Sequence, residues 1–250
     1  MRPNAVDARA PAFGYGPPWG YLATLGWIVL AFFIGAGAAY VGYVLLYGGD
    51  IQRAMTGGYD GVLVALSTLI AAPIQIAVIV LAVYIRRWPL ARYLGLTLPT
   101  KREAIAALGI LVALTVLLEL SLLVFGQDPV PPFQREIYPS AKEAGWLPAL
   151  LVAIVLFGPT AEEIIFRGFM YRGFVREPGH EPFAILFLTL AFTALHAVQY
   201  DWVGLLQVFI LGLFLGWVRW ATGSTLLTIL LHMLVNLEAM IVTALRVDWR

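Results

Sequence analysis

The stretch YLATLGWIVLAFFIGAGAAYVGYVLLY, from Tyr21 to Tyr47, contains no charged side chain. A helix needs about 20 mostly apolar residues to cross the hydrocarbon core of a bilayer. This stretch therefore predicts a membrane-spanning helix. Its glycines Gly35, Gly37 and Gly42 would let a neighbouring helix pack closely against it.

The composition of the whole chain agrees with this reading. Of the 250 residues, 61% are hydrophobic and 12% are charged, whereas a soluble domain is about half apolar and about a quarter charged. One soluble core of this size could not bury so many apolar side chains. The formal net charge of +1 offers no basic surface for phosphates, so we expect no nucleic-acid partner. The lack of cysteine excludes disulfides, thiolate metal sites and a Cys nucleophile.

Further apolar segments follow the first along the chain. We predict an all-α fold, a polytopic transmembrane helical bundle of about seven spans, or six to eight if segments split or merge. The predicted spans are approximately residues 21–47, 61–85, 104–125, 146–171, 182–199, 202–221 and 224–245.

The spans and the polar segments between them divide the chain into five parts. These are a polar N-terminal tail at 1–18, N-terminal transmembrane helices at 19–125, an extracytoplasmic loop at 126–146, a transmembrane core at 147–245 and a tail at 246–250. The linker 86–103 concentrates Lys and Arg, and short cytoplasmic loops carry such an excess. We therefore expect a cytoplasmic N-terminus, and we recognise no cleaved signal peptide.

The fourth predicted span contains ionisable residues, which cost at least about 2.5–3.5 kcal/mol each at the middle of a bilayer. We expect Pro159 to break this helix and Thr160 to cap the new start, with Glu163 at the capping-box spacing. Glu163 and Arg167 are four residues apart and can neutralise each other. Glu162 points about 100° away from Glu163, so Arg167 does not obviously satisfy it.

Two later spans carry polar residues at helical spacing. Phe192 and His196 share one helix face, and His232 and Asn236 share another. Each pair alone has a structural explanation, such as packing or polar contacts between helices. Together with Glu162, however, these groups must converge on the bundle interior or on a water-filled cavity. We expect that cavity between the C-terminal helices, open toward the cytoplasm or laterally to lipid.

Such a set of side chains is suited to activating water. A Glu carboxylate can accept a proton from water, and a neutral His can hold the same water. A second His with an Asn can donate hydrogen bonds to a developing oxyanion. The alternative is Zn²⁺ bound by Glu162, His196 and His232, with water in the fourth position. The spacing alone does not separate the two arrangements.

Three motifs in order resemble a known family. They are Glu162-Glu163 with Arg167 followed by Gly168, then Phe192 with His196, then His232 with Asn236. Set on membrane helices, they resemble the CPBP or Abi family of CAAX prenyl endopeptidases and bacteriocin-processing or self-immunity proteins. The resemblance covers about Gly158 to Asn236, roughly the second half of the chain. The first half offers no motif.

The resemblance implies an intramembrane peptidase of the CAAX prenyl protease type, either glutamate-dependent or metal-dependent, whose catalytic part is the core at 147–245. By that resemblance, Glu162 and His196 position and deprotonate the attacking water, while His232 and Asn236 stabilise the oxyanion. The supporting residues would be Glu163, Arg167 and Phe192. We expect no cofactor, with zinc as the alternative.

The expected substrate is a membrane-associated protein or peptide, and the expected location is the cytoplasmic membrane of a prokaryote. Eukaryotic members of the family remove the last three residues from prenylated proteins, a substrate that this chain need not share. To bring Glu162 to the depth of His196, the fourth helix must extend inward to about Val175.

Two other functions remain open. A non-catalytic membrane regulator or bacteriocin-immunity-type partner would use the same bundle to bind another membrane protein. A small transporter or channel would line its path with Glu119, Glu162, His196 and Glu238. The sequence contains no pair of repeats of the kind that many transporters have, and this disfavours the transporter.

Overall fold

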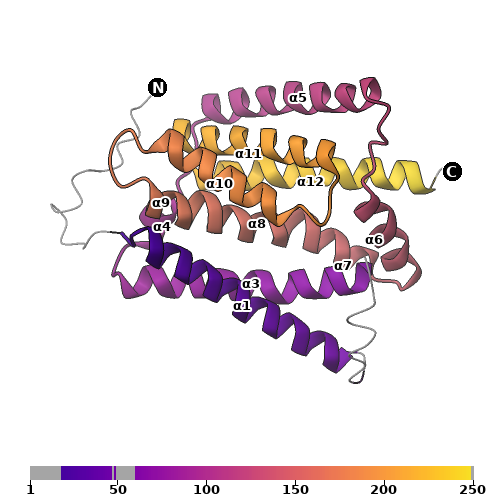
Figure 1. Cartoon of the computed structure of the whole chain (residues 1–250), viewed down its shortest axis with the longest axis horizontal. Helices are drawn as coiled ribbons and strands as arrows, with labels where there is room; N and C mark the ends of the chain where they lie inside the picture. The colour runs from indigo at the N-terminus through magenta and orange to yellow at the C-terminus, as the bar shows by residue number, and fades with distance from the viewer. Residues whose placement is uncertain (1–17, 47, 49–59, 249–250) are drawn as a thin grey trace.

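The computed structural model describes residues 18–46, 48 and 60–248. These residues form helices and no strands, which confirms the predicted all-α fold (Figure 1). The predicted tail at 1–18 lies outside them, except for Pro18. The helices are α1 (Tyr21–Leu46), α3 (Gly61–Ile85), α4 (Leu90–Leu94), α5 (Lys101–Val124), α6 (Pro132–Glu143), α7 (Leu147–Val152), η2 (Ala153–Phe157), α8 (Gly158–Glu163), η3 (Ile164–Met170), α9 (Tyr171–Phe174), α10 (Glu181–Leu195), α11 (Trp202–Thr222) and α12 (Thr225–Asp248).

Six helices in the described part of the chain are long and apolar enough to cross a membrane, so the protein is a multi-pass membrane protein. This number lies within the predicted range. The spans are Tyr21–Leu46, Gly61–Ile85, Lys101–Val124, Leu147–Phe174, Trp202–Thr222 and Thr225–Asp248.

The predicted span at 182–199 corresponds to α10, which has only 15 residues. It ends early because the chain turns after Leu195, and Asp201 then caps α11 by accepting a hydrogen bond from the Gly204 N–H at 2.9 Å.

The fourth span is one continuous helical path, so the predicted break at Pro159 is wrong. The segment before Pro159, η2, is a π-helix, in which the Gly158 N–H donates to the Ala153 carbonyl five residues back. A wide turn thus carries the helix into Pro159, which has no N–H of its own to donate. Thr160 is not a cap either, since its hydroxyl donates to the Leu156 carbonyl at 2.6 Å. The path ends at Phe174, which confirms the predicted extension toward Val175.

The segment expected to be a polar loop, 126–146, contains the helix α6. Its prolines suggested a loop, but Pro132 occupies the first helical turn, where the missing N–H costs nothing. The buried face of α6 packs against α3 and α7. At the end of α12, Asp248 accepts hydrogen bonds from Tyr138 of α6 at 2.9 Å and from Lys142 at 2.8 Å. These bonds fix the last turn of α12, which continues past the predicted end at residue 245.

The helices lie roughly along one direction, with α5 at the top of Figure 1, α11 and α12 below it, α8 in the middle and α3 and α1 at the bottom. Two glycines of α11 pack closely against α10, because a Cβ on Gly212 would lie 2.9 Å from Thr189 and one on Gly216 would lie 2.8 Å from Ile185. The helix α5 packs on α11 and α12, with Ala107 and Leu111 buried there.

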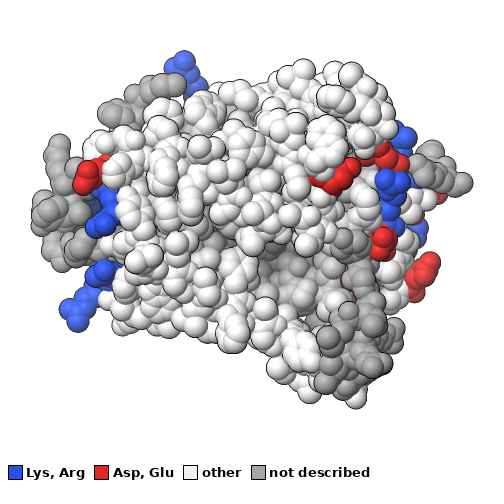
Figure 2. Space-filling view, viewed as in Figure 1, with Lys and Arg blue, Asp and Glu red and all other residues white. Residues whose placement is uncertain are grey.

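On the face shown in Figure 2, most charged side chains lie at the two ends of the bundle and few lie between them. The spans that form this middle belt are largely apolar. This distribution suits a helical bundle with its apolar flanks in lipid. One end includes the basic linker and the end of α9, and the other includes α6 and the end of α12. The side of the membrane to which each end belongs stays a prediction from the charge pattern.

Candidate active site

An ion pair lies at the centre of the bundle. The Nη1 of Arg167 lies 2.8 Å from Oε1 of Glu163, one helical turn away, and both side chains are buried. This confirms the pairing expected from their spacing. Arg167 is held further by the Gly212 carbonyl, which accepts from its Nη2 at 3.1 Å, and by the Phe192 ring, 4.9 Å from its guanidinium carbon. A buried charge is tolerated when it is paired and hydrogen-bonded in this way.

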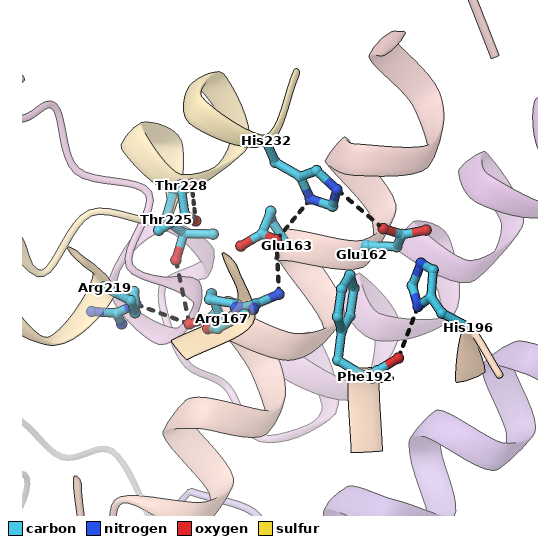
Figure 3. A network of polar contacts seen from close by, with 10 residues as sticks. Glu162, Glu163, Arg167, Phe192, His196, Arg219, Thr225, Thr228 and His232 are labelled. Carbon is cyan, nitrogen blue, oxygen red and sulfur yellow. Dashed lines mark hydrogen bonds and ion pairs between the residues drawn. The ribbon is translucent and has the colours of Figure 1, made fainter. Parts of the chain in front are cut away.

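His232 joins this pair to Glu162 (Figure 3). Its Nδ1 lies 3.0 Å from Oε1 of Glu163, and its Nε2 lies 3.7 Å from Oε2 of Glu162. Carboxylate oxygens accept hydrogen bonds, so Nδ1 donates to Glu163. We call these four residues the ionic network: Glu162, Glu163, Arg167 and His232. Its two carboxylates carry two negative charges and its guanidinium one positive charge, so the net charge is zero only in the form with a protonated His232.

The two adjacent glutamates have different surroundings. Glu163 has no exposed side-chain surface, whereas Glu162 exposes 34% of its side chain. The expectation that Arg167 does not satisfy Glu162 therefore holds. The ionisable group that lies beside the Glu162 carboxylate is His232. Glu163 serves the structure of the network, and Glu162 is the carboxylate that other molecules can reach.

His196 follows directly on the end of α10. Its Nδ1 lies 2.8 Å from the Phe192 carbonyl oxygen, which can only accept, so Nδ1 carries the proton. In the neutral ring, Nε2 then has a free lone pair. Figure 3 shows the His196 ring beside Glu162, across from His232. No direct hydrogen bond joins Glu162 to His196 within the described part of the chain.

Phe192 is buried, and its ring lies between the Arg167 guanidinium and the His196 ring (Figure 3). Its ring centroid lies 4.5 Å from that of His196, 5.9 Å from that of His232 and 5.2 Å from that of Phe166. Its spacing to His196 therefore orients the histidine in two ways, by ring packing and by the backbone carbonyl.

Asn236 lies one turn after His232, as its spacing indicates, and its Nδ2 donates to the Ile154 carbonyl of η2 at 2.9 Å. One amide hydrogen is thus committed to the backbone, and the second remains free to bind another group.

A cavity of about 130 Å³ adjoins these residues, between α5, α10, α11 and α12. The lining includes Phe192, His196, His232 and Asn236, as well as the isolated acids Glu119 and Glu238. Glu162 is not part of the lining, but its neighbours His196 and His232 are. The helix α5, which has no motif, supplies one wall, so the C-terminal helices do not enclose the cavity alone.

The lining continues to Pro129, Pro131 and Gln134, at the start of α6. These residues lie at the end of the bundle opposite the basic linker. A cavity open toward the cytoplasm or laterally to lipid was expected. The described lining extends away from the basic linker, and the opening to lipid stays a prediction. The short helix α10 explains the difference, because its chain turns within the bundle and leaves space between that turn and α6.

Residues 144–237 match the family model of type II CAAX prenyl endopeptidase Rce1-like proteins. We call residues 144–237, the part of the chain that is similar to this family, the Rce1-like domain. The match confirms the predicted CPBP and CAAX protease family, which at the family level is one of intramembrane peptidases. No curated protein and no solved structure matches the chain. The Rce1-like domain contains all eight residues of the three motifs, and α5 lies outside it.

Zinc ligation was the alternative for Glu162, His196 and His232. Among the described residues, no three His, Asp or Glu side chains are gathered closely enough to hold a metal ion. His232 has one ring nitrogen on Glu163, and His196 has one on a carbonyl, so each keeps Nε2 for a further ligand. Metal-binding histidines usually have their second nitrogen bonded in this way, so the choice between zinc and a metal-free site stays a prediction.

The Rce1-like domain also has a buried cation that belongs to none of the three motifs. Arg219 is 8% exposed, and its Nε donates to the Arg167 carbonyl at 2.9 Å while its guanidinium lies 4.7 Å from the Tyr171 ring centre. It holds the backbone that carries Arg167. The signal in the sequence was weak, because an arginine in the last turn of a helix is usual.

Proposed function

We propose that this protein is an intramembrane endopeptidase that hydrolyses a peptide bond of a membrane-associated protein or peptide with water activated by Glu162 and His196. The observation that carries the proposal is the ionic network beside a cavity lined by His196 and Asn236. It gathers a reachable carboxylate, a histidine with a free Nε2 and two donor side chains from three helices, inside a domain of the peptidase family.

In this proposal the water lies between Glu162 and the Nε2 of His196. Glu162 accepts a proton as the water oxygen attacks the carbonyl carbon of the substrate. The resulting oxyanion receives hydrogen bonds from His232 and from the second amide hydrogen of Asn236. Glu162 then returns the proton to the leaving amine as the C–N bond breaks. Glu163, Arg167 and Phe192 act indirectly, by orienting His232 and His196.

The apolar flanks of the bundle suit a substrate that already lies in the bilayer. The matched family is named for CAAX prenyl endopeptidases, and a prenylated C-terminus is therefore one substrate to test. A segment of a transmembrane protein is the other. In both cases the bilayer delivers the substrate, so the partners are lipid and one membrane-associated polypeptide.

The direct test compares purified wild-type protein with the Glu162→Gln variant in proteoliposomes. We expect about a 10²- to 10⁴-fold loss of cleavage, because the variant removes the general base and keeps the shape of the side chain. A prenylated CAAX reporter peptide and its unprenylated counterpart separate the two substrate classes. The matched control is Glu136→Gln, an exposed acid on α6. Full activity in Glu162→Gln would refute the proposal.

Comparative peptidomics of membranes that contain wild type or Glu162→Gln identifies the natural substrate. Peptides that disappear only in the variant report both the activity and the cleavage site. Metal analysis of the active protein, with dialysis against a chelator, tests the zinc alternative. We expect cleavage to persist after dialysis, and loss that zinc restores would favour metal ligation instead.

The orientation in a prokaryotic cytoplasmic membrane is part of the same proposal. The chain has no cysteine, so single cysteines can be introduced without first removing others. Cysteines at Arg92 and at Glu143 lie at opposite ends of the bundle. With a cytoplasmic N-terminus, a membrane-impermeant thiol reagent added to intact cells should label only the cysteine at position 143.

A further inference from the structure

The residue Tyr200 is placed beside His196 by a tight turn. The His196 carbonyl accepts hydrogen bonds from the N–H groups of Gln199 at 2.9 Å and Tyr200 at 3.3 Å. The ring centroids of Tyr200 and His196 lie 6.0 Å apart, and Phe192 lies 4.5 Å from His196. His196 is thus flanked by an aromatic ring four residues before it and another four residues after it.

The start of α11 also fixes the Tyr200 ring. A Cβ on Gly204 would lie 2.9 Å from Cδ1 of Tyr200 and 3.0 Å from its Cβ. Gly204 is itself fixed, because its N–H donates to the side chain of the capping residue Asp201 at 2.9 Å. The ring therefore packs directly on the helix backbone, and its position does not depend on the hydroxyl.

Tyr200 lines the large cavity together with His196, His232 and Asn236. It also lines a neighbouring cavity of about 80 Å³ next to the segment before α6, so it separates the two spaces. Thr115 is the other hydroxyl residue in the lining of the large cavity, and its hydroxyl donates to the Leu111 and Val112 carbonyls, each at 3.1 Å. The Tyr200 hydroxyl makes no hydrogen bond to any residue that the structure describes.

The other polar donors of the cavity are largely committed to the protein. Asn236 donates to Ile154, and Gln207 donates to the Leu118 carbonyl at 3.2 Å, which leaves one amide hydrogen on each. The Nδ1 of His232 is hydrogen-bonded to Glu163, and its Nε2 lies 3.7 Å from Glu162, so only Nε2 remains for a ligand. An oxyanion in this cavity therefore meets few uncommitted donors.

The Tyr200 hydroxyl is suited to this task in the neutral range. Burial raises the pKa of Tyr200 to about 12, and the negative charge of Glu162 adds to the increase. The proton therefore remains on the hydroxyl well above neutral pH, where it can be donated in a hydrogen bond.

We propose that Tyr200 is a further catalytic residue, whose hydroxyl donates a hydrogen bond to the carbonyl oxygen of the substrate as that oxygen becomes negative, next to the water held by His196. The inference rests on the proposed peptidase function. No proton is transferred from Tyr200, and the ring additionally keeps His196 in place. The class of ligand that this position recognises is a hydrogen-bond acceptor adjoining the scissile bond.

The test is Tyr200→Phe, which keeps the ring and removes only the hydroxyl. With the reporter that the wild type cleaves, we expect kcat to fall about 10- to 100-fold while KM and the melting temperature stay unchanged. The matched control is Tyr84→Phe, an exposed tyrosine at the end of α3, which should match the wild type in all three measurements.

Three outcomes contradict the role of Tyr200. A kcat within twofold of the wild type would show that the hydroxyl is not used. A raised KM with unchanged kcat would show a contact made equally with bound substrate and transition state. A fall in kcat that accompanies a lower melting temperature would assign the effect to structure. An active wild type with inactive Glu162→Gln supports the proposed function independently, and a wild type that cleaves nothing overturns both proposals.

Discussion

The N-terminal helices and the Rce1-like domain are both apolar enough to span a bilayer, but they bury different groups. Buried positions of α1 and α3 are small or apolar, with Thr24 as the one polar exception among their described residues. The Rce1-like domain buries Glu163, Arg167 and Arg219, and His232 is nearly as enclosed. Burying a charged group costs folding free energy unless the charge is paired. The Rce1-like domain therefore carries a desolvation cost that α1 and α3 do not have.

The helix α5 belongs to the first region by sequence and to the second by position. It lies outside the family match and carries no motif, yet Thr115, Leu118 and Glu119 line the cavity. The comparison therefore separates two kinds of contribution. The Rce1-like domain supplies the groups proposed to react, and α5 supplies one wall of the cavity beside them.

The largest effect that would sharpen the comparison is expected from Arg167→Met. The variant leaves Glu163 buried without its cation, which should cost about 3–5 kcal/mol of folding free energy. Thermal unfolding in detergent measures this. The control is Arg102→Met at the exposed start of α5, which should change stability by less than about 0.5 kcal/mol. Equal stability of the two variants would contradict a structural role for the ion pair.

A smaller difference in stability is expected between alanine substitutions at two glycines, one in each region. In α11, an alanine at Gly212 would place its Cβ 2.9 Å from Thr189 and 3.6 Å from Nη2 of Arg167, which should cost about 1–3 kcal/mol by overpacking. In α5, a Cβ on Gly109 would meet nothing within 4 Å. Gly109→Ala should therefore stabilise its helix by about 0.5–1 kcal/mol. Melting temperatures that move in the same direction would disprove this contrast.

The smallest expected difference concerns two threonines in the same sequence pattern, Thr-x-x-Glu. Thr100 begins α5, and its hydroxyl accepts from the Glu103 N–H at 3.2 Å while Glu103 bonds back to the Thr100 N–H at 2.8 Å. Thr100→Ala should cost about 1 kcal/mol. Thr160→Ala removes only a bond to a carbonyl of its own helix and should cost less than about 0.5 kcal/mol. A larger loss at Thr160 would restore the capping interpretation.

This pair also shows where sequence reasoning succeeds and fails. The capping pattern occurs at both sites, but Thr100 follows Pro99 with an extended backbone, whereas Thr160 follows a residue that is already helical. The pattern at Thr160 was interpreted as a cap because Pro159 precedes it. Neither the π-helix before Pro159 nor its effect on the backbone has a signal in the sequence.

The spans and the Glu163–Arg167 pair could be predicted because both depend on residues close in the sequence. The bond between His232 and Glu163 could not, because it joins residues 69 positions apart. Spacing placed His232 and Asn236 on one face, but it could not show that one faces an acid pair and the other a backbone carbonyl. Local periodicity therefore identified the candidate residues, and packing between helices determines their partners.

The shortness of α10 has a consequence for the supply of the second reactant. Its 15 residues rise about 22 Å, less than the roughly 30 Å of a hydrocarbon core, so the chain at 196–201 turns before a full crossing. Irregular backbone at such a depth is tolerated only where protein or a hydrated space surrounds it. Tyr200 of this turn lines two cavities, so the truncated span leaves room for water inside an apolar bundle, next to the residue proposed to hold the hydrolytic water.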